Sequence, residues 1–165
     1  SLKKLLEACG PSFKVYDVDC ALVVPTREEL EAALAVASVV HLRGRDIATV
    51  CELLGLPELE PGLLAPAMTE RFGVSYCVIA DPRAGALVSS IAGEQVGMDI
   101  VEQGGGSLLG WHEAFLAAFV YHVFQGSTLA RCCGAAVQYA QSVGATNRAL
   151  SILAEPEIVT IKGQG

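Results

Sequence analysis

The stretch SVVHLRGRDIATVCELLG, residues 38–55, contains the unit that decides the fold. Its first part, SVVHL, is largely apolar and β-branched, which is typical of a strand buried on both faces. From Asp46 onward the apolar residues recur at helical spacing, and the pattern ends at Gly55, with Pro57 just beyond. A buried strand that leads directly into a helix indicates a parallel sheet covered by helices.

The same alternation of strand and helix continues on both sides of this unit. We predict strands at residues 14–19, 39–42, 76–80, 85–90 and 94–101, and helices at residues 2–9, 46–55, 113–124 and 129–143, with one more helix ending at Gly73. A further helix begins at Thr26, which forms a capping box with Glu29, and reaches Ala37. The Pro-containing turn between residues 80 and 85 predicts one antiparallel pair of strands. The expected fold is therefore an α/β three-layer domain, with a mostly parallel sheet and helices on both faces, over residues 1–150. Residues 151–165 are expected to form a C-terminal tail.

Composition limits the possible partners. The chain has 165 residues, of which 52% are hydrophobic and 18% charged, and its net charge is -7. Such a composition is globular, and the negative charge argues against nucleic acid or an anionic membrane as a partner. The longest apolar run, Ala114 to Phe124, is too short to span a bilayer. The first ten residues lack the apolar core of a signal peptide, so we expect a cytoplasmic protein.

Six cysteines and three histidines show no metal-binding spacing. No CxxC pair occurs, and the helix that contains HEAFL has no second histidine at the spacing of a zinc protease. We expect buried free thiols rather than redox or metal ligands.

Four stretches of the sequence have a familiar order and wording: LKKLLEACGPSFKVYDVD, ELEAALAVASVVHL, TERFGVSYCVIADPRAGALVSS and EAFLAAFVYHVFQG. Together they resemble the ribokinase-like (PfkB) carbohydrate kinases, the fructokinase-like members especially. The likeness extends to about residue 150 and corresponds to the C-terminal, nucleotide-binding half of such a kinase. It implies an ATP-dependent sugar kinase that uses ATP and Mg²⁺. The N-terminal half of the family, which contacts the sugar, has no counterpart in this sequence.

The family's D-T-x-G-x-G-D loop, which binds the transferred phosphoryl group, falls on residues 107–113. Gly110 matches the first glycine, Trp111 takes the variable position and His112 replaces the second glycine. Glu113 replaces the aspartate that acts as general base. By resemblance, Glu113 is the catalytic residue, and Gly110, Trp111 and His112 contact the nucleotide. The extra side chain of His112 and the longer side chain of Glu113 both disturb this site.

The other family motifs are altered as well. The N-x-x-E motif that organises magnesium falls on residues 43–46, so Asp46 is the one metal ligand that the resemblance retains, and Arg43 and Arg45 would repel the ion. The D-x-N-x-R strand end falls on Asp17, Asp19 and Ala21, and its arginine is lost. The T-x-G-x-x-G turn at the nucleotide phosphates falls on residues 80–85, which makes Gly85 a nucleotide contact.

The residues leave alternatives open. Glu113 is either a general base or an acid that favours the first helical turn; Trp111 either stacks on adenine or fills the hollow of an anion. Residues 103–107, QGGGS, form a phosphate cradle or a flexible loop. Arg43 and Arg45 either hold a phosphate or lie on a solvated turn. The chain is therefore either a sugar kinase that needs a missing half or a partner chain, or a non-catalytic kinase-like domain (a pseudokinase) that binds a nucleotide or a protein. In both cases we expect self-association as a homo-oligomer.

Overall fold

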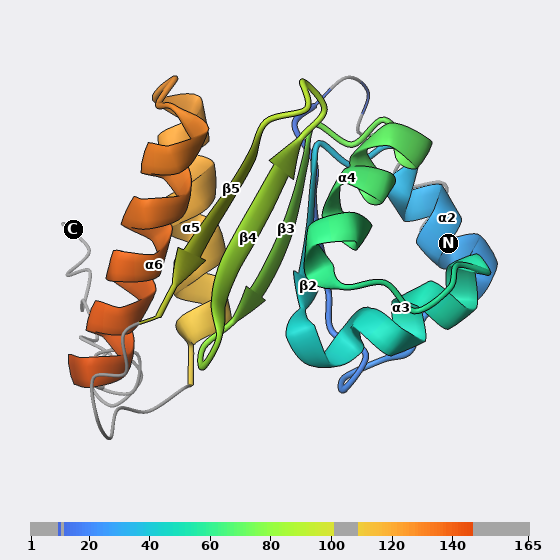
Figure 1. Cartoon of the computed structure of the whole chain (residues 1–165), viewed down its shortest axis with the longest axis horizontal. Coiled ribbons are helices and arrows are strands. Elements are labelled where there is room, and N and C mark those ends of the chain that lie inside the picture. Colours follow the sequence, from blue (N-terminus) through green and yellow to red (C-terminus); the bar gives the residue numbers. More distant parts are fainter. Residues whose placement is uncertain (1–9, 11, 101–108, 147–165) are drawn as a thin grey trace, which may run out of the picture.

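The computed structural model describes residues 10, 12–100 and 109–146 of the chain (Figure 1). The elements in chain order are β1 (Val15–Val18), α2 (Arg27–Leu34), β2 (Val39–Arg43), the 3-10 turn η1 (Gly44–Asp46), α3 (Ile47–Leu54), α4 (Pro61–Phe72), β3 (Tyr76–Asp81), β4 (Gly85–Ser90), β5 (Gln95–Asp99), α5 (Trp111–Phe124) and α6 (Leu129–Thr146). The helix predicted at residues 2–9 and the tail at 151–165 lie outside the described residues.

The strands form one sheet in the order β1-β2-β3-β4-β5. β2 pairs parallel with β1 and with β3, whereas β4 pairs antiparallel with β3 and with β5. Four of the five strands therefore run in one direction and β4 runs in the other. This confirms the mostly parallel sheet and the predicted antiparallel pair. The tight turn between β3 and β4 is held by Asp81, whose Oδ1 accepts from the backbone N–H groups of Arg83 (2.8 Å) and Ala84 (3.3 Å).

Helices cover both faces of the sheet, as predicted. Figure 1 shows α2, α3 and α4 on one face and α5 with α6 on the other. Alternate residues of β2 pack against the helices on opposite faces of the sheet, because successive side chains of a strand point to opposite faces. Val40 and Leu42 pack in the first layer, and Val39 packs in the second.

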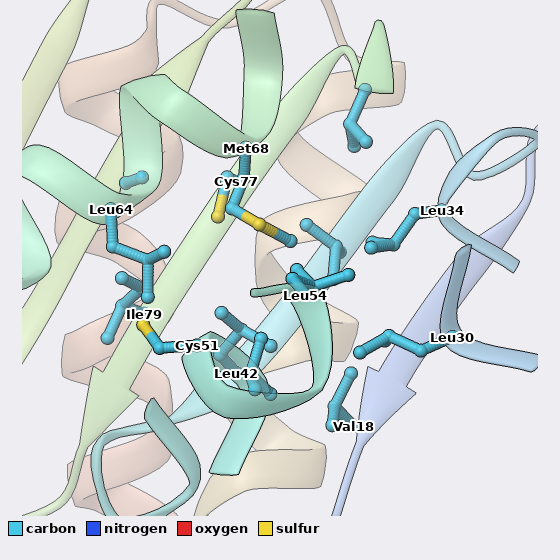
Figure 2. Close-up of a cluster of buried hydrophobic side chains, with 14 residues drawn as sticks. Val18, Leu30, Leu34, Leu42, Cys51, Leu54, Leu64, Met68, Cys77 and Ile79 are labelled. Carbon is cyan, nitrogen blue, oxygen red and sulfur yellow. The ribbon is translucent and has the colours of Figure 1, made fainter. Parts of the chain in front are cut away.

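Figure 2 shows the first of these two hydrophobic cores. Its labelled side chains come from β1, α2, β2, α3, α4 and β3: Val18, Leu30, Leu34, Leu42, Cys51, Leu54, Leu64, Met68, Cys77 and Ile79. The second core lies between the sheet and the helices α5 and α6, and its largest members are Trp111, Phe115 and Phe119. Each core fixes one set of helices on the sheet, so the strand ends and the start of α5 have defined positions.

Local signals explain the helix ends. Thr26 and Glu29 form the predicted capping box: the Thr26 hydroxyl accepts from Glu29 N (3.2 Å), and the Glu29 carboxylate accepts from Thr26 N (2.9 Å). Gly55 ends α3 at a φ of 64°, a conformation that favours glycine. The helix after Thr26 ends at Leu34 and is therefore shorter than predicted. The residues that follow turn toward β2, and Ser38 N donates to Lys14 O.

The cysteines in the described residues have free thiols. Four of them, Cys51, Cys77, Cys132 and Cys133, are buried, which confirms the prediction for those positions. Burial raises the pKa of the Cys133 thiol to about 11, so this thiol stays protonated at neutral pH. Within the same described part of the chain, no helix has both the length and the apolarity needed to cross a membrane.

Candidate functional site

Polar and charged side chains from β1, β2 and α5 and from the segment after β1 meet at the carboxyl end of the parallel strands. We call them the strand-end cluster: Asp17, Asp19, His41, Arg43 and Glu113. Asp17 and His41 face each other in the parallel register of β1 and β2, and Asp19 follows β1. Glu113 belongs to the first turn of α5, which begins at the same end of the sheet (Figure 1). The cluster therefore unites the predicted catalytic residue, Glu113, with both strand-end acids, Asp17 and Asp19.

Arg43 lies at the centre of this cluster and is only 4% exposed. Its Nη1 donates to the backbone oxygen of Val18 at 2.9 Å and lies 3.3 Å from both Asp17 Oδ1 and Asp19 Oδ2. Its Nη2 lies 3.4 Å from Asp17 Oδ2 and 3.5 Å from Glu113 Oε1. The prediction of a solvated turn is therefore wrong for Arg43, since carboxylates distant in sequence enclose it.

Arg45 behaves as a surface residue. Its side chain is 58% exposed, and its Nη2 donates to Asp19 Oδ1 at 2.8 Å. The solvated turn is therefore confirmed at this position. The two arginines are two positions apart, and their environments differ because β2 ends at Arg43.

His41 is fully buried beside Asp17, and its Nδ1 lies 2.8 Å from Asp17 Oδ1. Burial alone would raise the pKa of Asp17, but the hydrogen bond to His41 and the charge of Arg43 hold it below its ordinary value. Asp17 is therefore a stable anion at neutral pH. Sequence reasoning missed His41 as a site residue, although one polar residue within the apolar strand SVVHL was the signal for it.

The start of α5 follows a glycine with a left-handed backbone. Gly110 precedes the helix with a φ of 78°, where a glycine is favoured. Trp111 is buried and stacks on Phe115, with 5.4 Å between the ring centroids. The ring of Trp111 therefore belongs to the second hydrophobic core, which supports the alternative in which it fills space.

His112 follows with its ring centroid 5.4 Å from that of His41. Burial, together with the charges of His41 and Arg43, lowers the pKa of His112 to about 4. Its ring is therefore neutral at physiological pH. The Nδ1 of His112 and the Nε2 of His41 are buried and have no hydrogen-bond partner in the described part of the protein.

Glu113 is open to solvent on one side, since 67% of its side chain is exposed. It lies in the first turn of α5, where the helix dipole favours an acid, and its Oε1 faces Arg43. This position is compatible with both alternatives for Glu113. The ion pair with Arg43 is a constraint that neither alternative had included.

Asp46, the predicted metal ligand, is buried at the junction of η1 and α3. Burial raises its pKa, and its Oδ2 has no hydrogen-bond partner among the described residues. The nearest arginine nitrogen with which it pairs, Arg45 Nε, is 3.8 Å from Oδ1. In the described residues no group of three or more His, Cys, Asp or Glu is arranged to hold a metal ion. The strand-end carboxylates are moreover paired with Arg43, so these residues do not fit Mg²⁺.

Gly85 has a structural reason to be glycine. It begins β4 with a φ of 124°, and a Cβ atom there would lie 2.2 Å from the backbone oxygen of Met98 on β5. The close approach of β5 therefore explains this glycine without a nucleotide. The predicted loop at residues 103–107 lies outside the described residues.

A hollow of about 510 Å³ lies at the opposite end of the sheet. It is bounded by the start of β3, the end of β4, the end of α5 and the start of α6, and its lining includes Phe13, Tyr76, Ser90, Glu94 and Leu129. Nothing in the sequence predicted it.

Comparison with known proteins identifies solved structures that have a similar fold. No protein-family model matches the chain, and no curated protein sequence matches it. Solved structures do. A nucleoside kinase from Burkholderia thailandensis, in complex with inosine, matches with a TM-score of 0.66 and 17% identity. A nucleoside kinase of the ribokinase family from Methanocaldococcus jannaschii gives a TM-score of 0.71 at 15% identity. The tetrameric inhibited form of phosphofructokinase-2 from Escherichia coli gives 0.69 at 15% identity.

The match is nearly complete for this chain and partial for the others. The three alignments cover 84%, 86% and 93% of this chain, but 42%, 45% and 50% of the respective structures. The chain thus spans about half the length of the structures that it resembles. The predicted ribokinase-like resemblance is confirmed at the level of the fold: this chain has the fold of about half of a ribokinase-family carbohydrate or nucleoside kinase.

Proposed function

We propose that this chain is the nucleotide-binding half of a PfkB-type carbohydrate kinase and that it does not phosphorylate a sugar by itself. The ion pair between Arg43 and Glu113 carries this proposal. Glu113 is the one carboxylate at the position of the family's general base. Because Oε1 of Glu113 pairs with the guanidinium group, the other carboxylate oxygen is the one left to take a proton from a sugar hydroxyl.

Two further features support the loss of activity. His112 places a side chain where a glycine would let backbone N–H donors approach a phosphoryl group. Loss of one such N–H donor costs about 3 kcal/mol of transition-state stabilisation. The chain also spans only half of its structural neighbours. Orientation of the acceptor hydroxyl by a second half would supply roughly 7–11 kcal/mol of the barrier.

Binding of a nucleotide without turnover is part of the proposal. The N-terminus of a long helix preceded by a glycine is a favourable place for phosphate groups, and α5 begins in this way at Gly110. ATP would therefore lie against the first turn of α5, near Trp111 and His112. Mg²⁺ has no place in this arrangement, because the residues do not fit it.

Calorimetry with ATP, in the presence and absence of Mg²⁺, tests binding, and an assay of ADP release over a panel of sugars tests turnover. We expect no sugar-dependent ADP release from the wild-type chain. Robust turnover that disappears in Glu113→Gln would identify Glu113 as the base and contradict the proposal.

A second function, protein binding, is favoured by the surface at β1. This strand is the edge of the sheet, and the residues that follow it are apolar and exposed: Leu22 (80%), Val23 (75%) and Val24 (58%). Exposed strand edges and apolar patches are commonly covered by another polypeptide. We propose that the other half of such a kinase or a second copy of this chain covers them. The inhibited form of the E. coli enzyme is a tetramer, which makes a second copy a reasonable partner.

Sedimentation equilibrium of the wild type and of Val23→Asp tests this interface. We expect the wild type to self-associate and the variant to sediment closer to the monomer mass. Leu63→Asp is the matched control, since Leu63 is a similarly exposed apolar residue on α4. A monomeric wild type at high concentration would exclude the second copy and leave the separate half as the partner to test.

A further inference from the structure

We infer that the Arg43 guanidinium is a built-in cation that pairs with the strand-end carboxylates, so that this cleft does not fit a divalent metal ion. The inference rests on the proposed function in that it concerns the same site. It adds that the cleft is independent of Mg²⁺.

The geometry around Arg43 is that of an occupied cation position. Three carboxylates surround it: Asp17 from β1, Asp19 from the segment that follows, and Glu113 from α5. Both terminal nitrogens are engaged, each with two or more oxygens at 2.9–3.5 Å. Carboxylate oxygens are also the ligands that Mg²⁺ and Mn²⁺ prefer, so the guanidinium and a metal ion would compete for the same atoms.

A metal ion could enter only if Arg43 left, and its surroundings hold it in place. The residue is 4% exposed, and its Nη1 donates to the backbone oxygen of Val18 in a buried hydrogen bond. Departure of the side chain would remove a donor from this oxygen and leave Asp17 with its hydrogen bond to His41. A divalent ion beside the guanidinium would be repelled by it at short range and would find the neighbouring carboxylates already paired. Arg43 and a divalent ion therefore exclude each other.

Asp46 does not offer an alternative metal position. It is buried, its pKa is raised by burial, and the described residues near it form no group of ligands. The positive charge among the strand-end carboxylates thus comes from the chain itself.

The prediction that follows concerns metal binding by the protein without substrate. Arg43→Gln removes the positive charge that pairs with Asp17, Asp19 and Glu113, so it should bind Mn²⁺ roughly tenfold more tightly, or better, than the wild type, because affinity rises with the negative charge of the site. Calorimetry with Mn²⁺ alone and thermal unfolding at millimolar Mn²⁺ are the measurements. We expect Mn²⁺ to raise the Tm of Arg43→Gln and to leave that of the wild type unchanged.

Two control variants separate this effect from a general change of charge. Arg45→Gln removes an exposed arginine that contacts Asp19, and it should bind Mn²⁺ as weakly as the wild type. Arg43→Lys keeps the positive charge at the centre and should also gain no affinity. If Arg43→Gln is poorly folded alone, Mn²⁺ should restore its cooperative thermal transition.

Two results would overturn the inference: wild-type binding of Mn²⁺ that is lost in Asp17→Asn, or no gain of affinity and no rescue in Arg43→Gln. Sugar-dependent turnover by the wild type without any metal would instead contradict the proposed function and leave the built-in cation standing.

Discussion

Substitution of Gly85 by alanine measures whether this glycine serves the backbone or a nucleotide. The added Cβ would lie 2.2 Å from Met98 O and 3.0 Å from Asp99 Cα, both backbone atoms of β5 that no rotamer change can move. The φ of 124° is itself unfavourable for alanine and costs about 1–3 kcal/mol. Relief of the contact requires β4 and β5 to separate, with a cost of about 1–3 kcal/mol as for other overpacked sites. We therefore expect Gly85→Ala to lower the free energy of unfolding by about 3 kcal/mol or more.

Urea unfolding, followed by circular dichroism, is the assay. With an m-value of about 2 kcal/mol/M, the expected loss moves the midpoint down by about 1.5 M. Two glycines on the same hairpin provide controls. Gly93 also has a positive φ, 84°, but has open space around its Cβ position, so Gly93→Ala should cost only about 1–2 kcal/mol. Gly97 would place its Cβ in ordinary contact, 3.6 Å from Leu87 Cδ1, so Gly97→Ala should be nearly neutral. A Gly85→Ala protein as stable as the wild type would refute the steric argument and favour the prediction that Gly85 contacts the nucleotide.

His112 and the α2 cap provide two further predictions. Because the folded pKa of His112, about 4, is below the usual 6.5, the unfolded chain takes up this proton first as the pH falls. The free energy of unfolding should therefore fall progressively from about pH 6.5 to pH 4, by on the order of 2 kcal/mol. Urea midpoints measured over this pH range should fall less for His112→Gln than for the wild type. An equal fall in both proteins would contradict this role of His112. Thr26→Ala should lower the unfolding free energy by about 1 kcal/mol because the capping box is lost, while Thr26→Ser should retain most of it. Equal urea midpoints for the two Thr26 variants would show that the cap does not contribute.

The sequence by itself determined the layers of this protein. The apolar strand SVVHL, the Gly-ended helix after it and the capping box at Thr26 are local patterns, and each produced the element that it predicted. Such signals depend on neighbours within a few residues, so they need no knowledge of the rest of the chain. The sequence did not predict that α2 ends at Leu34 instead of Ala37, because the chain must turn there to enter β2, and this requirement overrides local helix propensity.

Only the tertiary structure decided the environment of the candidate site. Arg43 and Arg45 are nearly equivalent in sequence, yet one is enclosed by Asp17, Asp19 and Glu113 and the other is open to solvent. These carboxylates come from positions up to 70 residues away, and the parallel register of β1 and β2 together with the docking of α5 brings them to one guanidinium. The charge state and accessibility of a side chain depend on such distant partners, because electrostatic and desolvation energies are set by distance in space and not along the chain.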